Sequence, residues 1–303
     1  MKKYLLKIAL FFALMAVIDV ACGWIFGILR SKARGGQTHK NEYISNVCED
    51  DILILGSSKA DHHYVPSVFE DSLGLTCYNA GEMGCGIIPA YVRYKMVSQR
   101  HKPKLVLYEV TPGYDYIVDN GYSSYLGVIR QYTGDKMVRD IYLDFSDGLE
   151  GLRLMSNMYR NNSKLVANTK DLLAGADAYK GYEPLYGKIS SAKPVATAKD
   201  AKNVAIDSLK WKYMERLIED AKKDNVPIVF IVSPSYSGKL PQDYDPIMDM
   251  CEKYGVPLVN NIESDSFVQN KEMFQDVTHL NHAGAMAYSQ MIIPQIRHFI
   301  KNY

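Results

Sequence analysis

The chain has 303 residues, of which 47% are hydrophobic, and its 35 Lys and Arg stand against 34 Asp and Glu. This length suits one large globular domain or two small ones. Without residues 1–30, which hold four bases and one acid, 31 bases remain against 33 acids. The chain therefore has no basic field for a nucleic-acid backbone, which excludes a nucleic-acid partner.

The N-terminal segment has the composition of a membrane anchor. A run of 22 mostly apolar residues, from Ile8 to Leu29, lies between two basic residues and is long enough to cross a bilayer as a helix. A cleaved signal peptide has a shorter apolar region. We therefore expect an uncleaved anchor over residues 1–30, with one pass through the inner membrane and the large domain on the extracytoplasmic, periplasmic side. Asp19, a carboxylate at membrane depth, either faces a partner or snorkels.

After a polar segment at 31–48, expected to be a stalk, a domain covers residues 49–303. Apolar runs of strand length recur along it and are continuous rather than alternating, which is typical of strands covered on both faces. Helix-like segments lie between them. The pattern predicts a three-layer α/β/α fold with a doubly wound parallel sheet of about five strands. The expected strands are 51–56, 75–79, 104–110, 227–233 and 256–260. The expected helices are 65–72, 88–100, 203–224, 243–254 and one from His282 that Pro294 kinks or breaks.

Residues 113–200 interrupt this alternation between the third and fourth strands. They are rich in Tyr, Gly, Asn and Asp, and amphipathic helices are expected at 133–145 and 147–175. We interpret this insertion as a helical lid over the carboxyl edge of the sheet; the alternative is a passive extension.

The five cysteines have neither CxxC pairs nor metal-ligand spacing. Cys77 and Cys85 can pair in an oxidising compartment, or all can be free buried thiols; the spacing alone leaves both open. We expect no metal and no cofactor.

Two short stretches carry candidate chemistry. Gly56-Ser57-Ser58 ends the first expected strand, and ligands of parallel sheets bind beyond the carboxyl ends of the strands. In "MFQDVTHLNHAG", Asp276 precedes His279 by three residues, so its carboxylate can hold the imidazole and stabilise the charged ring, as in a Ser-His-Asp triad. Each stretch alone also fits a simple turn or a surface pair.

Together, the two stretches resemble the blocks of the SGNH (GDSL-type) serine hydrolases over residues 50–112 and 203–300. The resemblance implies the family's flavodoxin-like fold, with Ser58 as nucleophile, Asp276 as acid and His279 as base. The second block resembles "YNAGEMGCG" and implies an oxyanion hole formed by the N–H groups of Ser58 and Gly84. Gly81 is the second choice for the glycine.

The sequence departs from the family at two places. Ser57 replaces the usual aspartate of the first block, and "LVLYEVTPGYDY" lacks the asparagine that completes the oxyanion hole after the third strand. Thr111 lies closest to that place. Loss of one oxyanion donor lowers the rate about 100- to 1000-fold. His62, His63 and Thr111 are candidates for a substrate pocket, and both histidines also fit supporting or solvent-facing positions.

The resemblance implies a membrane-anchored serine esterase that removes acyl groups, expected to be acetyl, from a carbohydrate ester. A second interpretation is an O-acyltransferase on a cell-envelope polysaccharide, with a membrane-bound O-acyltransferase as partner. A third is a non-catalytic glycan-binding or assembly protein. The missing asparagine favours the third interpretation, whereas the intact set of Ser58, Asp276 and His279 favours the first two.

Overall fold

The computed structural model describes residues 1–146, 148–162, 164–177, 179–189, 205–238 and 242–300. The chain forms two compact units. The first unit consists of residues 1–43 and 126–177, and the second of residues 44–125 and 178–303.

A five-stranded parallel sheet lies at the centre of the second unit, in the order β2-β1-β3-β4-β5. This order confirms the predicted doubly wound α/β class. The chain runs from β1 outward to β2 and then crosses to the other side of β1, so the switch in direction lies between β1 and β3, where such sheets bind ligands. The strands are β1 Ile52–Gly56, β2 Cys77–Asn79, β3 Leu105–Glu109, β4 Ile228–Val232 and β5 Leu258–Asn260.

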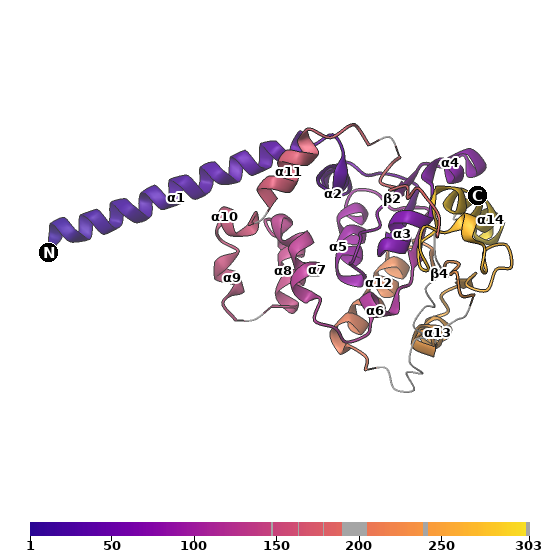
Figure 1. The fold of residues 1–303 in the computed structure, drawn as a ribbon. Helices are drawn as coiled ribbons and strands as arrows, with labels where there is room; N and C mark the ends of the chain where they lie inside the picture. The colour runs from indigo at the N-terminus through magenta and orange to yellow at the C-terminus, as the bar shows by residue number, and fades with distance from the viewer. Residues whose placement is uncertain (147, 163, 178, 190–204, 239–241, 301–303) are drawn as a thin grey trace. The chain divides into compact units, whose positions relative to one another are not determined.

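Helices cover both faces of the sheet, which explains why the strands have continuous apolar runs. Side chains of α4 (Pro66–Leu73) and α14 (His282–Ile296) share one buried cluster with residues of β1, β3 and β4. On the opposite face lie α5 (Ile87–Ser98), which packs on β1, and α12 (Ser208–Lys223), which packs on α5 (Figure 1). All positions of β1, β3 and β4 are buried as a result.

Two expectations about helices need correction. α14 is not broken at Pro294 but runs on to Ile296. Because Pro294 lies close to the end of the helix, it removes only one backbone hydrogen bond. A 3₁₀ turn follows, as is frequent at helix ends. The expected stalk contains α2, Gly36–Asn46, and Ile44 of this helix is fully buried. Burial of this one apolar side chain within a polar stretch packs the segment against the folded protein.

The insertion is helical, and α8 (Lys136–Asp144) confirms the helix expected at 133–145. The single helix expected at 147–175 is wrong, because the chain forms three short helices there. Ser156 separates α9 from α10. Its side chain accepts a hydrogen bond from the Tyr159 N–H and so caps the N-terminus of α10. The remaining helices of the insertion are α6 Pro112–Asp115, α7 Tyr122–Ile129, α9 Glu150–Arg153, α10 Asn157–Arg160 and α11 Lys164–Leu172, with the 3₁₀ turn η1 Arg130–Tyr132.

Residues 126–177 belong to the first unit, with the N-terminal helix, whereas the sheet belongs to the second. The lid over the sheet therefore stays a prediction. Residues 190–200 of the insertion, and the expected start of the following helix at 203, lie outside the described residues. The other short elements are α3 Ser58–His63, α13 Asp245–Tyr254, η2 Gln242–Tyr244, η3 Lys271–Met273 and η4 Arg297–Phe299.

The N-terminal helix α1 covers Lys2–Ser31 and is apolar enough, over enough residues, to cross a membrane; a signal sequence has the same character. All five cysteines are free thiols, so Cys77 and Cys85 are not paired.

Candidate active site

The turn between β1 and α3 raises a serine at the carboxyl edge of the sheet. Gly56 ends the strand with φ +136°, in the half of backbone space that favours glycine. A Cβ at this position would lie 2.6 Å from the Glu109 carbonyl oxygen. Only glycine therefore allows the chain to turn here, and α3 begins two residues later at Ser58.

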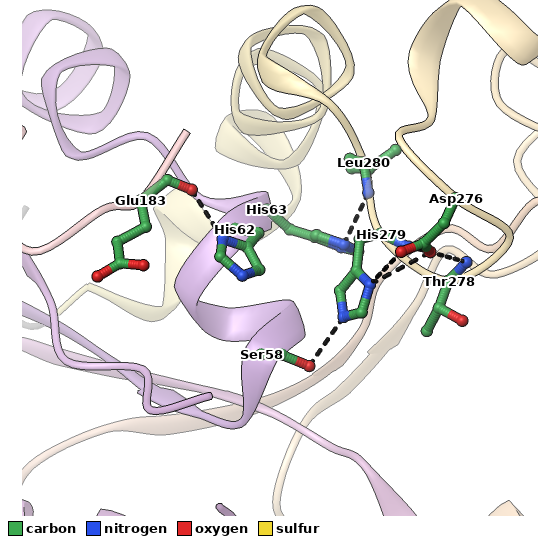
Figure 2. Close-up of polar contacts among 8 residues, drawn as sticks. All are labelled: Ser58, His62, His63, Glu183, Asp276, Thr278, His279 and Leu280. Atoms are coloured by element: carbon green, nitrogen blue, oxygen red, sulfur yellow. Dashed lines mark hydrogen bonds and ion pairs between the residues drawn. The ribbon is translucent and has the colours of Figure 1, made fainter. Parts of the chain in front are cut away.

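Ser58, His279 and Asp276 form one hydrogen-bonded chain (Figure 2). The Ser58 Oγ lies 2.8 Å from His279 Nε2. The other ring nitrogen, Nδ1, lies 2.9 Å from Asp276 Oδ2 and 3.2 Å from Oδ1. With Nδ1–H donating to the carboxylate, Nε2 has a lone pair to accept the serine proton, which is the tautomer a general base requires.

The short turn from Asp276 to His279 also holds the carboxylate. Asp276 Oδ1 accepts the backbone N–H groups of Thr278, at 2.7 Å, and of His279, at 2.8 Å. Burial raises the pKa of Asp276, but these bonds and the one from the His279 ring outweigh it and lower the pKa to about 2. The carboxylate is therefore charged at neutral pH and keeps the imidazole in one orientation.

A second series of hydrogen bonds, between fully buried residues, supports the backbone next to His279. His63 Nε2 accepts the backbone N–H of Leu280, the residue after His279, at 3.0 Å. Its proton is therefore on Nδ1, which donates to Ser233 Oγ at 2.8 Å; the Ser233 hydroxyl then donates to Glu109 Oε1 at 2.7 Å. Burial, with neighbouring cationic groups, holds the pKa of His63 well below its usual range, so this ring is neutral and fixes the backbone beside His279.

Glu109 ends this chain and accepts a further hydrogen bond on Oε2 from the hydroxyl of Tyr64. Burial raises the pKa of Glu109 above its ordinary value, although Lys59 and the hydroxyl donors act in the opposite direction. Sequence reasoning missed Ser233 and Tyr64. The signal available for Ser233 was its position as the first polar residue after the apolar run of β4.

The two histidines of α3 have different environments. His62 Nδ1 donates to the Glu183 carbonyl oxygen at 2.7 Å, and its ring meets that of His279 edge to face at 5.6 Å (Figure 2). His63 has no exposed surface, and both of its ring nitrogens bond within the protein. The expectation that His63 lines a substrate pocket is therefore corrected: its position is a supporting one.

The loop after β2 distinguishes the two candidate glycines for the oxyanion hole. The Gly81 N–H donates to Asn79 Oδ1 at 3.0 Å, so it is not available to a substrate. Gly84 has φ +68°, is partly exposed, and its N–H has no hydrogen-bond acceptor among the described residues. Of the two, only Gly84 is free to donate.

The two departures from the family blocks contact each other. The hydroxyls of Ser57 and Thr111 lie 2.7 Å apart. Asp115 Oδ2 accepts the backbone N–H of Thr111 at 2.6 Å, and burial raises the pKa of Asp115 to about 7. Thr111, the residue closest to the place where the resemblance would put that asparagine, is therefore held against Ser57, the residue before Ser58.

Within the described part of the chain, no three or more His, Cys, Asp or Glu side chains gather in a group that suits a metal ion.

Comparison with known proteins finds no matching family model and no matching curated protein. Solved structures with a similar fold of the chain include a "putative acylhydrolase" of Bacteroides fragilis. It has 12% identity and a TM-score of 0.42, and the match covers 86% of this chain and 95% of that one. A GDSL-like lipase of Bacteroides thetaiotaomicron has 11% identity, a TM-score of 0.39 and coverages of 86% and 99%. An acetyl xylan esterase has 12% identity, a TM-score of 0.39 and coverages of 81% and 99%.

Proposed function

We propose that the chain is a membrane-anchored serine esterase of SGNH type that removes acetyl groups from a carbohydrate through a covalent acyl-enzyme. The observation that carries the proposal is the continuous chain from the Ser58 hydroxyl through His279 to Asp276, with 2.8 Å and 2.9 Å between the bonded atoms. A serine is a weak nucleophile until an adjacent base takes its proton, and this arrangement supplies that base.

In the proposed reaction, Ser58 Oγ attacks the ester carbonyl carbon while its proton moves to His279 Nε2. The negative carboxylate of Asp276 stabilises the imidazolium that forms. The bond to the sugar oxygen then breaks, and the imidazolium returns the proton to that oxygen. Water, deprotonated by His279, attacks the acyl-serine and releases the carboxylic acid and free Ser58.

The negative oxygen of the tetrahedral intermediate needs donors. We assign them to the backbone N–H of Ser58, the first residue of α3, and to the N–H of Gly84. The hydroxyl pair of Ser57 and Thr111 lies beside this place and is our candidate for the contribution of the absent asparagine. Such preorganised donors usually provide a large part of the rate enhancement.

A cluster of aromatic rings beside the triad supports a carbohydrate substrate. The ring of His282 lies 5.9 Å from that of Tyr182 and 5.7 Å from that of Tyr186. Tyr186 is 66% exposed, and the same segment supplies the Glu183 carbonyl that holds His62. Tyrosine offers an apolar face for the C–H groups of a sugar and a hydroxyl for its polar groups.

Helix α1 supports membrane anchoring. Its side chains are exposed along most of its length, as a bilayer-spanning helix requires, and it is long enough to cross the hydrocarbon core. We place the catalytic unit on the extracytoplasmic side of the inner membrane.

The test uses the full chain in detergent micelles and measures acetate release from acetylated oligosaccharides. We expect turnover by the wild type and a fall of at least about 1000-fold in Ser58→Ala. Ser72→Ala, which changes an exposed serine of α4 outside the site, is the control and keeps most of the activity. Equal rates for wild type and Ser58→Ala contradict the proposal.

An added unacetylated glycan distinguishes hydrolysis from transfer. If the added glycan becomes acetylated at the expense of free acetate, the chain is a transferase instead. Glycan binding by the wild type with no turnover identifies a non-catalytic protein.

A further inference from the structure

The first unit has an exposed apolar surface outside α1. Six large hydrophobic side chains within residues 149–166 are at least half exposed, and we call them the apolar platform: Leu149, Leu152, Met155, Met158, Leu165 and Val166. Apolar surfaces of this kind mark sites that contact a membrane or another protein.

The platform is attached to α1 at a defined level. Asp19 of α1 accepts hydrogen bonds from the Ser156 hydroxyl at 2.6 Å and from the backbone N–H groups of Asn157 and Met158 at 2.8 Å and 2.9 Å. Gly23, one turn further along α1, leaves room for the Asn157 side chain, because a Cβ there would lie 2.7 Å from it. The carboxylate thus caps α10 and fixes its height along α1.

That height matches one face of a bilayer. From Lys2 to Asp19 the helix rises ~26 Å at 1.5 Å per residue, close to the ~30 Å of a hydrocarbon core. With Lys2 and Lys3 at one face and the long side chain of Lys7 extending back to that face, Asp19 and α10 lie at the other. A span centred on Asp19 would instead put Arg153 and Arg160 into hydrocarbon, which is unfavourable. Figure 1 shows α9 and α10 forming the edge of this unit that lies toward the free N-terminal half of α1.

The charges near the platform fit the same interface. Residues 149–166 hold three bases, Arg153, Arg160 and Lys164, and one acid, Glu150. That acid is 6% exposed, accepts hydrogen bonds from Tyr142 and Tyr159 and pairs with Arg153 at 3.0 Å, so Arg160 and Lys164 supply the excess positive charge. Apolar side chains interspersed with cationic ones are typical of helices that lie in the headgroup region of anionic membranes.

We propose that the apolar platform inserts into the lipid surface at the level of Asp19, so that α9, α10 and the start of α11 form a second membrane contact beside the spanning helix. The inference rests on the proposed membrane anchoring through α1. The occupant of the platform is the lipid bilayer itself, and the contact holds the first unit at a fixed height above the membrane.

The experiment uses the full chain in liposomes that contain anionic lipid and acyl chains brominated near the headgroup. For the label at Phe11 the acyl chains are brominated near the bilayer centre, because Phe11 lies ~13 Å along the helix from Lys2. Cys22→Ser provides the background, because the other four cysteines are buried. Single cysteines labelled with bimane replace Met155 and Val166 on the platform. Asp140, whose side chain is 54% exposed on α8, is the matched control, and Phe11 reports on α1. We expect quenching at 155 and 166 to be at least about twofold greater than at 140, as for side chains ~5–10 Å deep in the interface.

The other outcomes separate the two claims. Quenching at Phe11 but not at 155 or 166 overturns the platform and leaves the anchor intact; no quenching at Phe11 overturns both. If the labels at 155 and 166 are shielded in native membranes but reach water in pure lipid, a protein partner covers the surface and the lipid proposal is wrong.

Discussion

The substitution His63→Ala should lower both the free energy of unfolding and kcat. His63→Ala leaves the buried Leu280 N–H without a partner and removes the hydrogen bond to the Ser233 hydroxyl, which keeps its own bond to Glu109. An unsatisfied buried group costs ~1–3 kcal/mol and a lost hydrogen bond ~0.5–1.5 kcal/mol, so the expected loss is ~1.5–4.5 kcal/mol. Since native proteins are stable by only ~5–15 kcal/mol, this is a large fraction of the total.

His62→Ala is the matched control, because it removes one ring from the same helix, and among the described residues that ring has one hydrogen bond, to the Glu183 carbonyl. We expect a loss of about 1 kcal/mol or less for this change. Urea unfolding of the full chain in micelles, followed by Trp211 fluorescence in a Trp24→Phe background, measures both. Trp211 packs on Tyr116 within the sheet-containing unit.

The catalytic effect follows from the bond to Leu280, which fixes the backbone beside His279. Misplacement of a base by ~1 Å can lower the rate ~100-fold, so kcat should fall in folded His63→Ala while KM stays unchanged. His63→Gln, whose amide can both accept and donate, should restore part of the rate. If His63→Ala unfolds no more easily than His62→Ala and keeps its kcat, the buried chain has no such role.

Three further changes test other parts of the site. Asp276→Asn should lower kcat ~100- to 10,000-fold. The same change should remove a contribution to stability, because the pKa of Asp276 is lowered from 3.8 to about 2 in the folded protein. The carboxylate therefore stabilises the wild type above pH ~4, and this contribution disappears as the pH falls toward 2. A variant with the same acid unfolding profile as wild type would contradict the second part. Tyr186→Ala should raise KM for a glycan ester several-fold and leave p-nitrophenyl acetate unaffected, given its exposed ring; equal effects on both substrates would argue against a sugar contact. Gly56→Ala should unfold at lower urea concentration or fail to fold, because its Cβ meets the Glu109 carbonyl; a normal unfolding midpoint would show that the turn relaxes.

The sequence predicts those features that depend on local patterns. The strands could be found because each is a continuous apolar run. The set of Ser58, Asp276 and His279 could be proposed because Ser58 closely follows such a run, Asp276 stands three residues from His279, and the two stretches together resemble the SGNH blocks. The bond between His63 and Ser233 joins residues 170 positions apart, and no spacing rule connects a lone serine to a lone histidine. The division of 147–175 into three helices depends on Ser156, whose partner Asp19 lies 137 residues away.

Reaction with a fluorophosphonate probe tests most directly whether Ser58 is an activated nucleophile. We predict that the wild type and Ser57→Ala become labelled at Ser58, that labelling slows sharply in His279→Ala, and that Ser58→Ala remains unlabelled. Equal labelling of wild type and Ser58→Ala, or modification at Ser57 instead, would contradict it.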